Sequence, residues 1–164
     1  MDFSIYTLKE LLLAALKSEA DSKKVYLQLA KRVKNYLLKD KFEFLAKEEE
    51  RHRVFIEDMF KKEFPRKEPI LPKETSVPLP RINIIDEDVP ISKILVQAMD
   101  AEKASHDFYL ELSKYFRDDP KVKNTLLYFA TMEIGHYKLL EVEKQAMESY
   151  EAADDYWPMM HIGP

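Results

Sequence analysis

Four glutamates and two histidines recur in two equivalent sets along the chain. In each set a glutamate precedes a Glu-x-x-His pair, by 30 residues in the first set and by 31 in the second. The sets are Glu19, Glu49 and His52, then Glu102, Glu133 and His136. Carboxylate oxygens and imidazole nitrogens bind iron and manganese. One Glu-x-x-His pair arises easily by chance, but two at equivalent places of an internal repeat indicate a metal site.

The chain offers few other groups for chemistry. It has 164 residues, no cysteine and 2 glycines, which excludes thiolate catalysis, iron–sulfur clusters, cysteine zinc sites and phosphate-binding loops. With 26 Lys plus Arg against 30 Asp plus Glu, the net charge of -4 leaves no broad basic face for nucleic acid. No apolar run approaches the roughly 18 residues of a membrane span, and the first residues lack a signal-peptide pattern. We therefore expect a cytoplasmic protein without nucleic-acid or membrane partners.

Helices must position the two sets. Apolar residues recur at helical spacing in two long segments on each side of residues 65–90. The segment 65–90 holds six of the nine prolines and keeps no helical period, so it is expected to be a linker. The sequence thus predicts an all-α protein: residues 1–150 form a four-helix bundle of two helical hairpins joined by a long crossover, and residues 151–164 form a tail.

The turns within the hairpins leave local signals. Asp119 and Pro120 are typical of a helix N-cap and a first helical residue, so the fourth helix is expected to begin there. In the first half, Asn35 and the capping-box pattern at Asp40 are both candidates, and local chemistry does not choose between them. Aligning the two sets places Asn35 opposite Asp119. We therefore expect the first turn near Asn35, with Asp40 inside the second helix.

The spacing directs the carboxylates inward. Glu19 and Tyr26, seven residues apart, share the apolar face of one helix, and Glu102 and Tyr109 do the same in another. In each hairpin the ligands lie about 16 residues from the turn, at one level along the bundle. A 26-residue linker extends up to roughly 85 Å, enough to bring the two hairpins' ligands together. All six groups are expected to converge midway along the bundle.

Charge favours a metal in this interior. Four ionised carboxylates sharing a dry core would repel one another, and each would carry a desolvation cost of several kcal/mol. Two divalent cations would cancel the four charges and leave both histidines neutral. Oxygen ligands with a minority of imidazole suit iron, or manganese as the alternative, better than structural zinc. We therefore expect a centre of two iron ions.

With this ligand set the chain resembles the rubrerythrin branch of the ferritin-like superfamily over about residues 5–150. The resemblance implies a di-iron centre and a ferritin-like four-helix bundle. It also implies these roles: terminal carboxylates Glu19 and Glu102, bridging carboxylates Glu49 and Glu133, histidine ligands His52 and His136, and tyrosines that donate hydrogen bonds to carboxylates, Tyr26 and Tyr109. From the residues alone, the two tyrosines fit a plain core role equally well.

The resemblance also implies a function. Such centres react with hydrogen peroxide or oxygen, or oxidise and store iron, so the leading hypothesis is an oxidoreductase of peroxidase or ferroxidase type. Because the chain has no cysteine for a rubredoxin domain, its electrons would come from an external donor such as a rubredoxin-like protein. Ser105 stands where rubrerythrins have an extra glutamate that binds iron on oxidation. The alternatives are ferritin-like iron storage and a non-redox metal-binding bundle, and a homodimer or small homo-oligomer is expected.

Other polar residues have less specific signals. His106 lies one turn after Glu102 but overshoots its line slightly, so we expect it on another face of the helix. Glu48 and Glu50 flank a ligand and are expected on a solvated face. The tail's aromatic residues and methionines suggest packing on the bundle or on a neighbouring subunit. The tail also holds three candidate ligands for a second metal: Asp154, Asp155 and His161.

Overall fold

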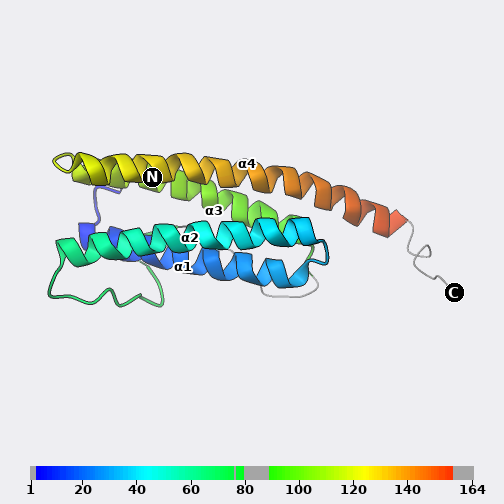
Figure 1. Cartoon of the computed structure of the whole chain (residues 1–164), viewed down its shortest axis with the longest axis horizontal. Helices are drawn as coiled ribbons and strands as arrows, with labels where there is room; N and C mark the ends of the chain where they lie inside the picture. Colours follow the sequence, from blue (N-terminus) through cyan, green and yellow to red (C-terminus); the bar gives the residue numbers. More distant parts are fainter. Residues whose placement is uncertain (1–2, 76, 80–88, 157–164) are drawn as a thin grey trace.

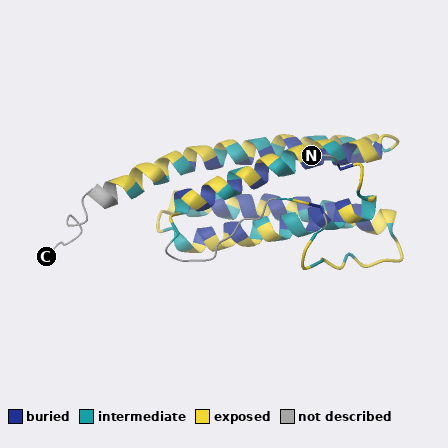
Figure 2. Cartoon of the chain, turned by 180° about the vertical axis from the view of Figure 1, so that it is seen from behind, coloured by how far each residue is buried: buried dark blue, intermediate teal, exposed yellow. Residues whose placement is uncertain are grey.

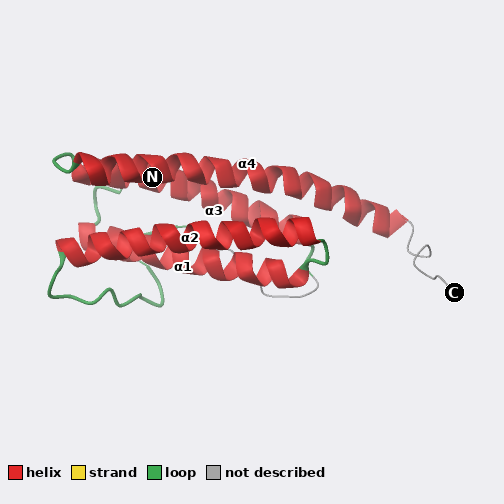
Figure 3. Ribbon diagram, viewed as in Figure 1, coloured by secondary structure: helices red, strands yellow, loops and turns green. Residues whose placement is uncertain are grey.

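Four long helices make up most of the part of the chain that the computed structural model describes (Figure 1). It describes residues 3–75, 77–79 and 89–156, and of residues 153–156 the backbone alone. The helices are α1 (Leu8–Arg32), α2 (Tyr36–Glu63), α3 (Ile91–Leu112) and α4 (Pro120–Tyr156), with a short 3₁₀ helix η1 (Ser113–Phe116) after α3. The described part of the chain contains helices and loops and no strand (Figure 3).

The helices pair as two hairpins, α1 with α2 and α3 with α4 (Figure 1). The end of α2 and the start of α3 lie at opposite ends of the bundle, so the connection between the hairpins runs along its length. This arrangement confirms the predicted all-α, ferritin-like four-helix bundle. Within the described ranges, no helix is both long enough and apolar enough to cross a membrane.

Side-chain caps begin α1 and α4. The Thr7 hydroxyl accepts a hydrogen bond from the Glu10 backbone N–H at 3.3 Å, and the Glu10 carboxylate accepts one from the Thr7 backbone N–H at 2.9 Å. This reciprocal capping box starts α1. Asp119 Oδ1 accepts from the Val122 backbone N–H at 3.1 Å, and Pro120 is the first residue of α4, as the sequence predicts.

Asn35 starts α2. Its Oδ1 accepts hydrogen bonds from the backbone N–H groups of Leu37 at 2.9 Å and Leu38 at 3.2 Å. These bonds satisfy two amides that have no carbonyl partner within the helix. Asp40 lies exposed inside α2, so the repeat, and not the local pattern at Asp40, located the turn correctly.

Loss of the Asn35 cap should lower the stability of the protein. Asn35→Ala should lower the free energy of unfolding by about 1 kcal/mol, which is about 2–4 °C in melting temperature for a chain of this size. Asp40→Ala is the matched control, because it changes an exposed helical position that caps nothing and introduces a stronger helix former. Thermal unfolding of both variants checks the prediction, and an equal loss in the two would contradict it.

The core consists of two apolar clusters separated by a polar belt. One cluster, nearer the start of α1, includes Leu12, Phe60 and Phe108, and the other, nearer its end, includes Leu29 and Phe42. Figure 2 shows the buried residues on the facing sides of the helices. The four glutamates and two histidines lie between the clusters, and none is more than 4% exposed. The apolar layers therefore exclude water from both sides of the belt.

The far end of α4 extends beyond the bundle (Figure 1). The Glu151 carboxylate accepts hydrogen bonds from the Ser92 backbone N–H, at 3.1 Å, and from the Ser92 hydroxyl. Because Pro90 has no side-chain donor or acceptor, α4 supplies the cap for α3. Residues 157–164 lie outside the described part of the chain. No side chain is described for the three tail residues considered as metal ligands: Asp154, Asp155 and His161.

Candidate metal centre

The six predicted ligands meet midway along the bundle, in two overlapping groups of four. Within each group, one ligand atom from every residue lies within 4.8 Å of the others. The first group is Glu19, Glu49, His52 and Glu133, and the second is Glu49, Glu102, Glu133 and His136. Glu49 and Glu133 belong to both groups. A carboxylate has two oxygens, so these two residues can bridge a pair of metal ions.

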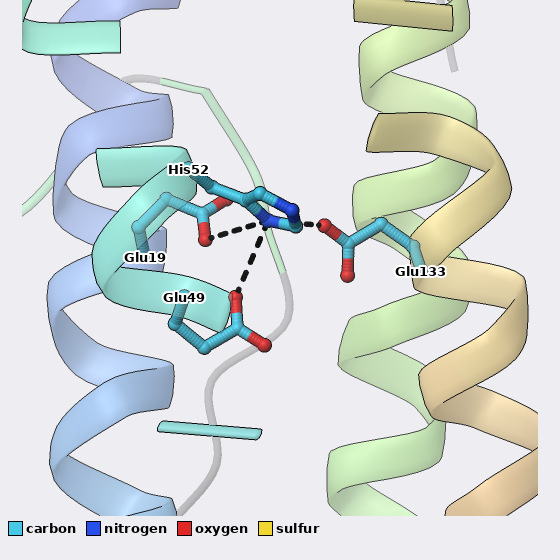
Figure 4. A group of neighbouring side chains, drawn as sticks. All are labelled: Glu19, Glu49, His52 and Glu133. Atoms are coloured by element: carbon cyan, nitrogen blue, oxygen red, sulfur yellow. Dashed lines mark ion pairs between the residues drawn. The ribbon is translucent and has the colours of Figure 1, made fainter. Parts of the chain in front are cut away.

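The first group is centred on His52 (Figure 4). Its Nδ1 lies 3.0 Å from Glu133 Oε1, 3.6 Å from Glu19 Oε2 and 3.7 Å from Glu49 Oε2. Glu133 reaches in from α4, whereas the other three side chains come from α1 and α2. The group is therefore complete only when the two hairpins are packed together.

The second group repeats this geometry around His136. Its Nδ1 lies 3.3 Å from Glu133 Oε2, 3.4 Å from Glu49 Oε1 and 3.5 Å from Glu102 Oε2. Glu49 and Glu133 thus each turn one oxygen toward His52 and the other toward His136. That is the orientation that two bridging carboxylates need.

Most atoms aimed into the centre have no hydrogen-bond partner. They are Glu19 Oε2, Glu49 Oε1, His52 Nδ1, both carboxylate oxygens of Glu133, and His136 Nδ1. A buried polar atom without a partner costs about 1–3 kcal/mol. Two divalent cations would satisfy these atoms and match four carboxylates in charge, so the donor set fits a pair of metal ions. The oxygen-rich, cysteine-free set favours iron or manganese.

The two bridging carboxylates are hard to ionise without metal. Burial raises the pKa of Glu49 well above its usual range, and repulsion from Glu102 and Glu133 adds to the effect. Burial also raises the pKa of Glu133 well above its usual range, and the neighbouring Glu102 adds to the effect. Both carboxylates shared by the two groups therefore hold a proton to a higher pH than an exposed glutamate does.

The first terminal pair carries charge. Burial works to raise the pKa of Glu19, but the neighbouring His52 and Glu49 side chains outweigh it and hold the pKa below its ordinary value. Burial works to lower the pKa of His52, but the adjacent carboxylate of Glu19 outweighs it and raises the pKa. Glu19 and His52 therefore each stabilise the charged form of the other.

The second terminal pair behaves in the same way. Burial opposes ionisation of Glu102, but the neighbouring Glu133 and His136 side chains lower its pKa below the ordinary value. Burial opposes protonation of His136, but the carboxylates of Glu102, Glu133 and Glu49 outweigh it and raise the pKa. Protons on the groups with a raised pKa therefore compete with metal ions for the same ligand atoms.

Two buried tyrosines hold the terminal carboxylates. The Tyr26 hydroxyl donates to Glu102, and the Tyr109 hydroxyl donates to Glu19. Each tyrosine therefore bonds the glutamate of the opposite hairpin rather than the one seven residues before it. Both tyrosines are at most 1% exposed, so they are core aromatics whose hydroxyl groups fix ligand orientation. Burial raises the pKa of both hydroxyls, so they remain donors.

Removing one of these hydroxyls should destabilise the protein. Tyr26→Phe and Tyr109→Phe keep the ring but delete a hydrogen bond to a buried charge, which is expected to cost about 1.5–3 kcal/mol each. Chemical denaturation of the metal-free chain measures the loss. Tyr36→Phe is the control, because Tyr36 is 81% exposed and should change stability by less than about 0.5 kcal/mol. A loss as large in Tyr36→Phe as in the buried variants would contradict a stabilising role for the hydroxyls of Tyr26 and Tyr109.

One flanking carboxylate differs from the expectation. Glu48 is 5% exposed and pairs with the Arg51 guanidinium, so the predicted solvated position was wrong. Helix α2 packs against both α1 and α4, and its buried arc is therefore wider than a single apolar stripe. Glu50 is partly exposed and pairs with Lys23 at 3.0 Å and Arg53 at 2.9 Å.

His106 and Phe129 complete the surroundings. His106 lies outside both metal groups, on another face as predicted, with its Nδ1 2.7 Å from the Ala130 carbonyl oxygen. A carbonyl oxygen only accepts, so the proton is on Nδ1. The Phe129 ring lies 4.1 Å from the His52 ring, centroid to centroid, and covers this ligand. The sequence showed Phe129 only as one more apolar residue on the core face, four positions before Glu133.

Fold and site together define a ferritin-like bundle with a buried carboxylate–histidine centre compatible with a di-iron site. A family model described as rubrerythrin matches residues 10–144, a span that contains all six ligands. The chain belongs to the rubrerythrin family. It is similar to the solved structure of a hypothetical protein from Pyrococcus furiosus, with 31% identity and a TM-score of 0.80 over 91% of this chain and 95% of that one. No curated protein matches the chain.

Proposed function

We propose that the protein is a non-haem di-iron redox protein that reduces hydrogen peroxide or oxygen with electrons from an external donor. The observation that carries the proposal is the shared use of Glu49 and Glu133 by two metal groups. A structural metal needs one closed coordination shell, whereas a carboxylate-bridged pair can exchange two electrons. Reduction of one hydrogen peroxide to two waters takes two electrons and two protons, and a pair of ferrous ions supplies two electrons.

The protein's own residues provide the setting for this chemistry. The hydroxyls of Tyr26 and Tyr109 hold the two terminal carboxylates, so the ligand positions are set before a metal binds. Phe129 and the two apolar clusters keep bulk water from His52 and its neighbours. A dry, preorganised centre strengthens the electrostatic contacts between ligand and cation.

Ser105 restricts the mechanism. It lies one helical turn after Glu102 in α3 and carries no carboxylate. A mechanism in which a glutamate at this position binds iron on oxidation is therefore not available to this chain. The proposed cycle uses the six ligands of the two groups without an exchange of glutamates.

Stopped-flow oxidation tests the proposal. The full chain loaded anaerobically with two ferrous ions should be oxidised completely by about one equivalent of hydrogen peroxide, because each peroxide accepts two electrons. The same measurement with oxygen compares the two oxidants. Failure of both oxidants to react would contradict the redox function.

Sizing separates this function from iron storage. A small oligomer that binds about two irons per chain supports a redox protein, because the described residues of each chain form one such centre. A large shell that takes up hundreds of irons would instead establish storage. Metal analysis of protein purified without added metal addresses the third alternative, since a bundle that holds zinc and does not react with peroxide is not a redox protein.

A further inference from the structure

A line of aromatic rings connects the metal centre with the protein surface on one side. The ring centroids of Phe3 and Phe108 are 5.2 Å apart, and those of Phe108 and Tyr109 are 5.8 Å apart. Tyr109 lies 6.1 Å from the His52 ring, and its hydroxyl donates to Glu19. Two ligands of the first group are therefore joined to Phe3 by rings in close contact.

Among the described residues, this line of rings is present in only one half of the internal repeat. Tyr26 is the counterpart of Tyr109, and it likewise bonds a terminal glutamate. The residue before Tyr26 is Val25, where Phe108 precedes Tyr109. Among the described residues, Tyr26 makes no ring contact of this kind. Core packing alone does not require rings on one side only, because Val25 fills the equivalent position with an aliphatic side chain.

The outer end of the line opens into a surface hollow. The hollow measures about 270 Å³ and is lined by Phe3, Ser4, Glu111, Lys114, Tyr115 and Arg117. It forms where the segment before α1 crosses toward α3 (Figure 1), and the Tyr115 hydroxyl donates to the Phe3 carbonyl oxygen at 3.1 Å to hold that segment in place. Phe3 is 5% exposed, whereas Tyr115 is 42% exposed at the rim.

The charge of the lining is opposite to that of the whole chain. Lys114 and Arg117 stand against one carboxylate, Glu111, which pairs with Lys114. This leaves one net positive charge at the rim, on a chain whose net charge is -4. A local positive rim on an acidic protein attracts a negatively charged surface of a partner.

We propose that an acidic one-electron carrier protein docks over this hollow and that its electrons reach the metal centre through Phe3, Phe108 and Tyr109. The inference rests on the proposed redox function and specifies where the donor binds. Two molecules of reduced carrier are oxidised, one electron each, for every two ferric ions reduced to ferrous ions, and no atom is transferred. Electron transfer falls steeply with distance, so closely spaced rings between the docking surface and the ligands shorten the gaps the electron must cross.

Docking is tested first without electron transfer. The probe is zinc-substituted rubredoxin, which is acidic and redox-inert, titrated against the iron-loaded full chain by fluorescence anisotropy at low and high salt. The double variant Lys114→Glu with Arg117→Glu should weaken binding by about tenfold and remove most of its salt dependence. The control with the same charge change is Lys34→Glu with Lys93→Glu, both exposed and at the opposite end of the bundle. Equal weakening in the two double variants, or none in either, would overturn the docking site.

The ring route is tested by reduction kinetics. Reduced iron rubredoxin should reduce the diferric protein about tenfold more slowly in the Lys114→Glu, Arg117→Glu variant, because fewer docked complexes form. Phe108→Leu should slow reduction while leaving zinc-rubredoxin binding unchanged, and dithionite, which needs no docking, should reduce every variant at one rate. Unchanged reduction by rubredoxin in Phe108→Leu would overturn the route.

Two further outcomes separate the inference from the proposed function. If wild-type protein binds zinc rubredoxin at the hollow but is neither reduced by a donor nor oxidised by peroxide or oxygen, the redox function fails while the docking site stands. If the charge-reversed variant loses reduction by free flavin mononucleotide hydroquinone but keeps reduction by rubredoxin, the hollow serves a small molecule, and the protein-docking proposal is wrong.

Discussion

Loading with ferrous iron should raise the melting temperature by about 10–20 °C, and Glu49→Ala or Glu133→Ala should abolish both the loading and the rise. A free ion at about 100 times its dissociation constant contributes about 2.7 kcal/mol per site, so two sites contribute about 5 kcal/mol. For a chain of this size, each kcal/mol corresponds to about 2–4 °C. Because Glu49 and Glu133 serve both groups, either substitution removes a ligand from both metal positions.

The structure offers a matched control for this experiment. Glu48→Gln changes another buried glutamate of α2, adjacent to Glu49 but outside both metal groups. This variant should still load about two irons per chain and keep the increase in melting temperature, because its ligand set is intact. Metal analysis and differential scanning calorimetry give the two readouts. Unchanged loading in Glu49→Ala and Glu133→Ala, or loss of loading in Glu48→Gln, would eliminate the assigned centre.

Stability of the metal-free protein should be greatest at mildly acidic pH and should fall as the pH rises past neutrality. Four groups have a pKa raised by folding: Glu49, Glu133, His52 and His136. Their contribution is fully present below their unfolded pKa values and is lost as the pH rises through the folded values. Two groups have a lowered pKa, Glu19 and Glu102, and their contribution is lost as the pH falls below about 4.5.

Metal binding should follow the opposite trend. The bound ions need the four carboxylates ionised and the two imidazoles neutral, so loading divalent ions should release protons from the groups whose pKa is raised. Affinity, and with it the increase in melting temperature, should therefore rise with pH. Calorimetric titration in buffers of different ionisation enthalpy counts the protons. Release of no protons would contradict the raised pKa values of these four groups.

Much of the centre could be predicted from the sequence because its ligands are set by helical periodicity. A residue's place on a helix face and its height from a turn depend on spacing along the chain, and both located Glu19 and Glu102 correctly in the interior. The repeat also resolved the choice between Asn35 and Asp40, which local capping chemistry could not make. In these cases the information lies within one helix or one hairpin.

Contacts between the hairpins could not be predicted in the same way. The sequence placed Tyr26 on the face of Glu19, yet its hydroxyl bonds Glu102 of the other hairpin. It placed Glu48 in solvent, yet packing of α2 against two neighbouring helices buries it. Which side chain meets which across the interface depends on the rotation and register of one hairpin relative to the other. The spacing of residues within a single hairpin carries no information about either.

The sequence by itself determined the helices, their turns, the six inward-facing ligands and the absence of cysteine, because each follows from residue type and period. Only the tertiary structure decided that Glu49 and Glu133 divide their oxygens between His52 and His136, and that each tyrosine bonds a glutamate of the opposite hairpin. It also decided that, among the described residues, a line of aromatic rings reaches the surface on one side alone. These features arise where residues distant in the chain meet, and packing of the two hairpins fixes their geometry.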